Sequence, residues 1–288
     1  MQTFMTRIRL ACAAALWLLG AGVAPAQDYR EGHNFIATKV YSEADDRAIL
    51  DAFEGLRVAD VSDGMDFVGL QNVGRMEPAI HALWKDTADY AHRFAGIAIT
   101  VRYVPTQQAG PGDSLSYEDY RAWEGRWYGE RSSEPFVDLI RRGSAIIIDE
   151  APDADVGSIG SYNIMAWQLA GAVGVVTDAT ARDTDEISTE RIPLYFRKPG
   201  RGIRPGRNEV ESVNRPVVVG GVLVVPGDVV VADGDGVIVV PRARAIAVAR
   251  YARRIMEADM AGRRDLYEQT RRDPDPSIGG AADPAETP

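Results

Sequence analysis

Just past its midpoint, this 288-residue chain reads Gly160-Ser-Tyr-Asn-Ile-Met-Ala-Trp-Gln-Leu-Ala-Gly-Ala-Val-Gly-Val-Val-Thr-Asp-Ala-Thr-Ala-Arg182-Asp183. The pattern predicts a turn, an amphipathic helix and a buried strand over residues 174–177, followed by an adjacent arginine and aspartate. A guanidinium can bind a carboxylate, and an aspartate can hold a hard divalent metal ion. The first amides of the helix, at residues 161–163, are free to bind another anionic group. The segment therefore predicts a site for a small 2-oxo acid chelated to a metal.

The segments on either side predict α/β structure. Residues 95–104 form a β-rich apolar run closed by Pro105, and residues 145–149 form a second buried strand. Two further strand regions, 215–225 and 229–240, are joined by a Pro-Gly-Asp turn. Helices are expected to start at Ser42, at Val58 and at Phe136. A long amphipathic helix is expected over residues 242–267.

Two segments have a composition that is unusual for a compact core. Residues 107–134 combine two tryptophans and three tyrosines with acids and arginines. We interpret them as a surface insertion whose aromatic side chains pack locally, the alternative being that they shape a pocket or a subunit contact. Residues 191–208 are rich in Gly, Pro and Arg and predict a long exposed loop. Its basic cluster could guide anionic substrates, although a solvated loop is the favoured interpretation.

The N-terminus has the pattern of a bacterial secretory signal peptide. Arg7 and Arg9 precede an apolar run, and Ala24-Pro-Ala26 provides a cleavage site. The apolar run, about 14 residues, is short for a membrane span. Residues 1–26 are therefore expected to be removed and the mature protein to be periplasmic or secreted, with no membrane association after cleavage.

Composition excludes several function classes. The formal net charge of the whole chain is −10, and it becomes −12 without residues 1–26, so nucleic acid is not an expected partner. Cys12 is the only cysteine, so the mature chain would contain no disulfide. The three histidines are scattered, which argues against a histidine-based zinc site.

Four segments in order resemble the RraA-like family, named for the regulator of ribonuclease activity A. They are Val58-Ala-Asp-Val-Ser-Asp-Gly-Met65, the 160–183 unit, and the runs at 217–228 and 231–241. The resemblance extends over about residues 58–268. These proteins share a fold with the 4-hydroxy-4-methyl-2-oxoglutarate (HMG) aldolases and are often mislabelled demethylmenaquinone methyltransferases. No glycine-rich S-adenosylmethionine loop is present in this sequence, so we set that label aside.

The resemblance implies a compact α/β sandwich of the swivelling phosphohistidine-like type, assembled as a homotrimer or hexamer. Together with the signal-peptide pattern and the composition of the C-terminal end, it divides the chain into a signal peptide (1–26), an N-terminal arm and helix (27–57), the RraA-like domain (58–272, with the 107–134 insertion) and a disordered tail (273–288).

The resemblance also implies a metal-dependent lyase, with its site between subunits. Such an enzyme would release pyruvate from a small anionic 2-oxo acid by retro-aldol cleavage, or decarboxylate oxaloacetate. Asp183 would hold Mg²⁺ or Mn²⁺, and Glu257 from a neighbouring subunit, with Asp259 nearby, would contribute an acid. The implied substrate-binding group is Arg182 with the helix start, that is, Gly160, Ser161, Tyr162 and Asn163.

Position 161 departs from the aldolases. They carry an acid 21 positions before the arginine, whereas this chain has Ser161, which can cap a helix but cannot accept a proton at neutral pH. Loss of such an acid typically lowers metal affinity or activity about 10- to 100-fold. Two alternatives stay open: a non-catalytic RraA-like trimer that binds an anionic ligand or a protein, and an enzyme that dehydrates or epimerises sugar acids. Ribonuclease E is not an expected partner of a secreted chain.

Overall fold

The computed structural model describes residues 32–151 and 155–278. Two compact units are distinguished, residues 1–37 and residues 38–288, and every helix and strand below belongs to the second. The expected signal peptide, 1–26, and residues 279–288 of the expected tail lie outside the described residues.

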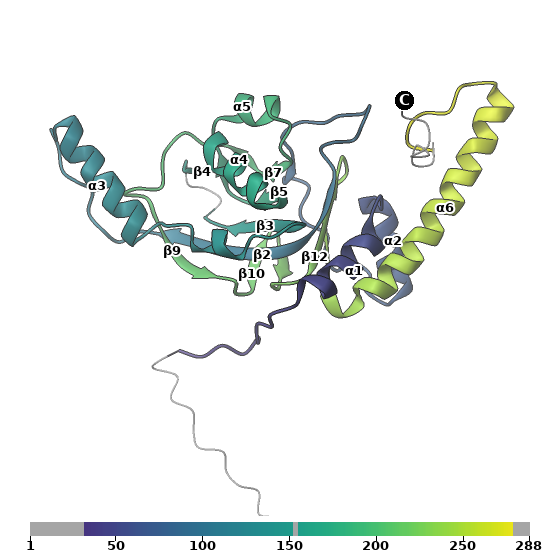
Figure 1. Ribbon diagram of the computed structural model, residues 1–288, viewed down its shortest axis with the longest axis horizontal. Helices are drawn as coiled ribbons and strands as arrows, with labels where there is room; N and C mark the ends of the chain where they lie inside the picture. Colours follow the sequence, from purple (N-terminus) through teal and green to yellow (C-terminus); the bar gives the residue numbers. More distant parts are fainter. Residues whose placement is uncertain (1–31, 152–154, 279–288) are drawn as a thin grey trace, which may run out of the picture. The chain divides into compact units, whose positions relative to one another are not determined.

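An eight-stranded mixed sheet forms the centre of the second unit (Figure 1). The path is β1 (His81–Ala82), β7 (Leu194–Phe196), β5 (Ala172–Thr177), β3 (Ser144–Asp149), β2 (Phe94–Pro105), β12 (Val229–Asp233) and β13 (Gly236–Val240), and β9 (Asn208–Val213) pairs with the far end of β2. The pairings β2–β3, β3–β5 and β5–β7 are parallel and the others antiparallel. Because β1 also approaches β13, the sheet is nearly closed and barrel-like. The α/β class is thus confirmed, but the sheet curls where a sandwich was expected.

Burial on both faces explains the continuous apolar strands. In β3, Ala145 and Ile147 point into a core shared with β12 and β13, whereas Ile146 and Ile148 point to the side of α4 (Ser161–Ala170). A parallel strand covered on both faces needs apolar residues at every position. The 145–149 prediction is confirmed for this reason.

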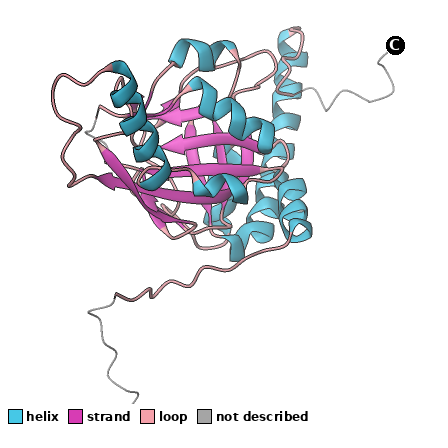
Figure 2. Ribbon diagram, turned by 60° about the vertical axis from the view of Figure 1, so that its left-hand side comes forward, coloured by secondary structure: helices cyan, strands magenta, loops and turns pink. Residues whose placement is uncertain are grey.

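Helices cover two parts of the sheet (Figures 1 and 2). α1 (Glu43–Phe53), α2 (Val58–Phe67) and α6 (Ala245–Thr270) pack with β12 and β13. α4 and α5 (Thr184–Thr189) lie against the β3–β5–β7 region. α1 begins as the sequence predicted, because the Ser42 side chain accepts a hydrogen bond from the amide of Asp45 in a capping box.

The remaining elements are one further α-helix and several short pieces. They are α3 (Tyr117–Glu130), the 3₁₀ turns η2 (Pro135–Leu139) and η3 (Arg242–Arg244), the strands β4 (Gly157–Ile159), β6 (Thr180–Ala181) and β8 (Lys198–Pro199) of a small parallel sheet, and the hairpin of β10 (Val217–Val219) with β11 (Val222–Val224). Each of the two predicted strand regions, 215–225 and 229–240, is therefore a hairpin of two strands, because Gly220-Gly221 and Gly234 with Asp235 interrupt the runs.

Two predictions for irregular segments differ from the structure. The 191–208 segment is not a continuous exposed loop, because it contains β7 and β8 and buries Arg204. Residues 273–278, expected as part of a disordered tail, turn back onto α6, where Asp275 accepts hydrogen bonds from Tyr267 and Arg263, both 2.6 Å.

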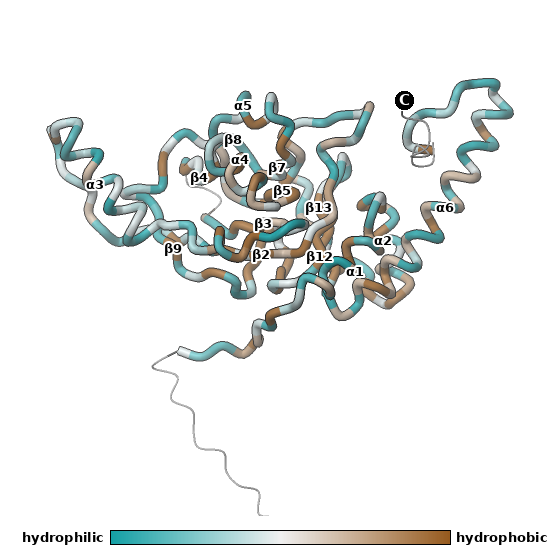
Figure 3. The backbone as a smooth tube through the Cα atoms, viewed as in Figure 1, coloured by the Kyte–Doolittle hydropathy of each residue, from teal (hydrophilic) through white to brown (hydrophobic). Residues whose placement is uncertain are grey.

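Hydropathy follows burial along the chain. Figure 3 shows brown segments in the central strands, while α3 and the outer part of α6 are mostly teal and white. None of the helices in the described part of the chain combines the length and the apolar character needed to cross a bilayer.

Candidate active site

Arg182 and Asp183 lie between the short strand β6 and α5, with Asp183 as the N-cap of the helix. The amide of Arg182 donates to the carbonyl of Ile159 in β4 at 2.8 Å, which fixes the chain at this point. Asp183 then adopts a left-handed backbone conformation, with φ 56° and ψ 41°. That conformation is uncommon for residues other than glycine, and it turns the aspartate side chain toward α4.

Two glycines of β4 and its end make room for this pair. A Cβ atom on Gly157 would lie 2.6 Å from Cβ of Arg182, and one on Gly160 would lie 2.9 Å from Oδ2 of Asp183. Any larger residue at either position would have to displace the arginine or the aspartate. The run from Gly157 to Gly160, called the seat below, therefore provides the space that Arg182 and Asp183 occupy.

The carboxylate of Asp183 is held by α4 on one side and is open on the other. Its Oδ2 accepts hydrogen bonds from the amide of Ser161 at 3.1 Å and from the Ser161 hydroxyl at 3.3 Å. Its Oδ1 is 3.9 Å from Nε of Arg182. Both side chains are more than one-third exposed, and Arg182 forms no other ion pair within the described ranges. A guanidinium and a carboxylate oxygen are thus both available to a ligand.

The structure brings the predicted helix start to the same place. Gly160 is the N-cap of α4, and the amide of Ser161 is already taken by Asp183, which leaves those of Tyr162 and Asn163 for an anion. The side chain of Tyr162 is 85% exposed and does not take part in this arrangement. The side chain of Asn163 donates to the carboxylate of Glu134.

Glu134 belongs to a buried network that the sequence did not reveal. Its carboxylate also accepts from Nε1 of Trp167 at 3.0 Å and from the guanidinium of Arg204. Arg204, 4% exposed, donates in addition to the hydroxyl of Tyr103 at 2.6 Å. The network fixes the first and second turns of α4 to the end of the 107–134 insertion and to the 191–208 segment.

The fit of a divalent metal can be judged from Asp183. Among the described residues only Oδ2 of its carboxylate accepts hydrogen bonds, so Oδ1, which is 3.9 Å from Nε of Arg182, can act as a ligand. Mg²⁺ is commonly bound by one or two carboxylates with several waters. Across residues 32–151 and 155–278 there is no cluster of three or more His, Cys, Asp or Glu side chains that could form a complete metal cage. The residues therefore fit a water-rich site with a single carboxylate from this chain.

The predicted second acid is not part of this site within one chain. Glu257 lies on the exposed part of α6 and has no hydrogen bond or ion pair with the 160–183 unit. Asp259 on the same helix is paired with Arg57 at 3.0 Å. The role of Glu257 as an acid from a neighbouring subunit stays a prediction.

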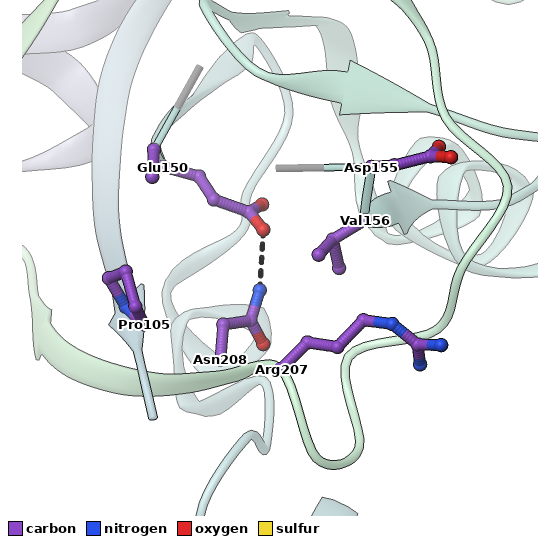
Figure 4. Close-up of a pocket in the computed structure, with 7 residues that line it drawn as sticks. Pro105, Glu150, Asp155, Val156, Arg207 and Asn208 are labelled. Carbon is purple, nitrogen blue, oxygen red and sulfur yellow. Dashed lines mark hydrogen bonds between the residues drawn. The ribbon is translucent and has the colours of Figure 1, made fainter. Parts of the chain in front are cut away.

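A separate cavity of about 320 Å³ lies beside the end of β3 (Figure 4). Glu150 and Asn208 line it and are hydrogen-bonded to each other, and Asn208 also donates to the Ser158 hydroxyl at 3.2 Å. Burial raises the pKa of Glu150 to about 7, which the hydrogen bonds from Ser158 and Asn208 offset only in part. Because Ser158 lies between Gly157 and Gly160, this cavity is next to the strand that seats the Arg-Asp pair, but Glu150 does not contact that pair.

The family model described as RraA-like, Aldolase/RraA, matches residues 58–239. The chain is 24% identical over 225 residues to Protein DlpA of Legionella pneumophila, covering 75% of this chain and 32% of that protein. It is 29% identical over 127 residues to a protein of Halalkalibacterium halodurans named "Putative 4-hydroxy-4-methyl-2-oxoglutarate aldolase", covering 44% of this chain and 60% of that protein. The chain thus spans about a third and 60% of the lengths of these two relatives.

Solved structures share the fold. An uncharacterized protein from Pseudomonas syringae pv. tomato matches with a TM-score of 0.59 and 27% identity, covering 78% of this chain and 97% of that one. RraAS2 of Streptomyces coelicolor, described as an unusual member of the RNase ES inhibitor RraA protein family, matches with a TM-score of 0.58 and 21% identity over 76% and 96% of the two chains. Since the family model spans more than half of the sequence and includes the seat, the Arg-Asp pair and α4, the resemblance seen in the sequence is confirmed and the chain belongs to the RraA-like family.

Proposed function

We propose that this protein is a metal-dependent lyase that releases pyruvate from a pyruvyl-containing 2-oxo acid by retro-aldol cleavage, or decarboxylates oxaloacetate. The observation that carries the proposal is the seat of Arg182 and Asp183, two half-exposed opposite charges beside the free amides of α4. The relative named as an HMG aldolase supports this choice of reaction.

The side chains can perform two of the steps that such a reaction needs, the binding of the substrate and the stabilisation of the enolate. The guanidinium of Arg182 and the amides of Tyr162 and Asn163 would bind the substrate carboxylate and orient the 2-oxo group. As the C–C bond breaks, negative charge develops on the 2-oxo oxygen, and the fixed positive charge of Arg182 stabilises it. Asp183 would hold the divalent ion, which when bound supplies Lewis-acid polarisation of the 2-oxo group.

Ser161 is the feature that favours the second candidate, a non-catalytic module. Its hydroxyl hydrogen-bonds to Oδ2 of Asp183, so it supports the carboxylate but brings neither charge nor a proton acceptor. An RraA-like oligomer with this site could bind a small anion without converting it. Localisation in the periplasm or outside the cell, and assembly as a homotrimer or hexamer, are part of the same proposal for both candidates.

The test is pyruvate formation from oxaloacetate by the purified protein with Mn²⁺, read through lactate dehydrogenase. We expect Asp183→Ala to abolish turnover and Ser161→Asp to raise it, because a second carboxylate beside Asp183 strengthens metal binding about 10- to 100-fold. Asp185→Ala is the matched control, since Asp185 is an exposed acid two residues further along the chain. It should keep full activity.

Each outcome separates the two candidates. Turnover that is lost in Asp183→Ala but kept in Asp185→Ala supports the lyase. If the protein and its Ser161→Asp variant both fail to release pyruvate, while oxalate with Mn²⁺ still raises the melting temperature, the lyase proposal fails and the binding module stands.

A further inference from the structure

The inserted helix α3 is anchored close to the candidate site. Trp127 is buried and donates through Nε1 to the carbonyl of Asn208 at 3.0 Å. Trp123 lies against Gly206, where a Cβ would be 3.2 Å from the indole ring. The end of α3 is thus fixed on residues 206–208, which are separated from Arg204 only by Pro205.

Tyr128, the neighbour of Trp127 on α3, faces Arg204. The guanidinium carbon of Arg204 is 5.5 Å from the centre of the Tyr128 ring and 5.0 Å from that of Tyr103. Through Glu134, the same guanidinium is linked to Asn163 in the first turn of α4. Arg204 and Glu134 therefore bridge Tyr128 to the turn whose amides are free.

The hydroxyl of Tyr128 is free to act on a ligand. Tyr103 uses its hydroxyl inside the network, but that of Tyr128 makes no hydrogen bond to any residue from 32 to 151 or from 155 to 278. Burial raises the pKa of Tyr128, and the nearby charges of Arg204 and Arg182 act in the opposite direction. The phenol is consequently neutral at physiological pH and can donate a hydrogen bond. It is near enough to Arg182 for the charge of the guanidinium to act on its pKa.

We propose that Tyr128 is a substrate-binding residue of the Arg182–Asp183 site and donates a hydrogen bond to an oxygen-bearing group at the far end of the 2-oxo acid. This inference rests on the proposed function. Arg182 and α4 would bind the end that all pyruvyl compounds share, and Tyr128 would select among them for a distant carboxylate or hydroxyl. With this role for Tyr128, the aromatic residues 107–134 take part in substrate specificity.

The test measures binding rather than turnover, by titration calorimetry with Mn²⁺ present. Pyruvate and 2-oxoglutarate share the 2-oxo carboxylate, but only the second carries a distant carboxylate. In Tyr128→Phe we expect the Kd of 2-oxoglutarate to rise about tenfold, which corresponds to about 1.4 kcal/mol, and that of pyruvate to change less than about twofold. Tyr120→Phe is the control, because Tyr120 is on the same helix and packs on Trp123 at 5.4 Å.

The outcomes distinguish this inference from the proposed function. An unchanged Kd for 2-oxoglutarate in Tyr128→Phe, or an equal loss for both ligands, overturns the role of Tyr128 and leaves the lyase proposal standing. If the unmodified protein binds neither ligand, the site itself is wrong and both proposals fall. The phenylalanine variant removes only a hydroxyl that has no protein partner, so its melting temperature should match that of the parent protein.

Discussion

At the scale of single residues, the site depends on how closely the backbone of Gly160 approaches Asp183. A Cβ at this position would be 2.9 Å from Oδ2 of the carboxylate, a distance that real Cβ atoms essentially never show. The backbone of Gly160 has φ −119°, which any residue can adopt. Space for the aspartate, and not backbone freedom, requires glycine here.

We therefore expect Gly160→Ala to leave the fold intact and to displace Asp183. A displacement of about 1 Å at a reacting centre can lower the rate about 100-fold, so kcat/KM for pyruvate release should fall by that order. The control is Gly125→Ala on α3, where a Cβ meets no atom within 4 Å. Equal activity of the two variants would contradict the seat that we assign to Gly160.

Glu150 predicts a dependence of stability on pH. Its ordinary pKa is 4.5 and burial raises it to about 7, so the unfolded chain loses this proton at a lower pH than the folded chain does. Unfolding is then favoured progressively as the pH rises from 4.5 to 7, and the difference between the two pKa values corresponds to about 3 kcal/mol. In Glu150→Gln, the free energy of unfolding measured with urea should not show this decline between pH 4.5 and pH 7.5. A parallel decline in both proteins would show that Glu150 does not titrate in this way.

The residues found from the sequence were those whose partners are adjacent in the chain. Arg182 and Asp183 are neighbours, and their place after a strand could be predicted from a local pattern. Glu134 and Arg204 are 70 residues apart, so nothing local showed that they pair. Glu150 followed a strand that was predicted correctly, but its pKa is set by burial in the folded chain and by hydrogen bonds from Ser158 and from Asn208, which is 58 residues away.

At the scale of elements, α2 and α6 are joined by a close backbone contact at Gly64. A Cβ on Gly64 would be 2.8 Å from the carbonyl oxygen of Val248 and 3.1 Å from Cβ of Ala252. Small residues on both helices permit this approach, and they lie in the core region that also contains β12 and β13. The glycine of the 58–65 segment is therefore explained by helix packing.

Two glycine-to-alanine substitutions should have opposite effects on stability. Gly64→Ala should destabilise the protein by about 1–3 kcal/mol, because the added methyl group forces α2 away from α6. Gly262→Ala, in the exposed part of α6 with no atom within 4 Å, should stabilise it by about 0.5–1 kcal/mol through helix propensity alone. Chemical denaturation of both variants checks the pair. Stabilisation by Gly64→Ala would contradict the close packing.

Elements could be predicted where one physical factor dominated. Burial on both faces made β2 and β3 recognisable, and the capping box at Ser42 marked the start of α1. α3 was not predicted as a helix, although its buried Trp127 and the aromatic residues at 120 and 123 have helical spacing. Its many exposed positions and two glycines obscured that spacing, because most of α3 does not face the core.

At the scale of the whole molecule, one chain presents the candidate site beside exposed apolar side chains. Tyr162, Met165 and Leu169 are 85%, 40% and 83% exposed, and their spacing places them on one side of α4 next to the Arg-Asp pair. Asp183 supplies a carboxylate there, and the described residues hold no group of three or more His, Cys, Asp or Glu side chains that could form a complete metal site. Both observations are consistent with the proposed assembly, in which a neighbouring copy covers α4 and contributes Glu257.

Complementation between inactive variants tests this assembly. Asp183→Ala and Glu257→Ala should each be inactive alone, because every site then lacks one of the two acids. After the variants are mixed, unfolded and refolded together in equal amounts, about a quarter of the sites in a closed ring would pair an intact Asp183 with an intact Glu257 from the next subunit. Pyruvate release should then recover to about that fraction of the parent activity.

The control for complementation is Glu268→Ala, which removes another exposed acid from α6 and should remain active by itself. Recovery of pyruvate release requires that Glu257 act across a subunit interface. If both acids of a site came from one chain, mixing the two variants would restore no site. A Glu257→Ala protein with full activity would remove Glu257 from the site. A monomeric native mass for the active protein would exclude a shared site altogether, and the lone carboxylate of Asp183 would then have to hold the metal without help from a neighbour.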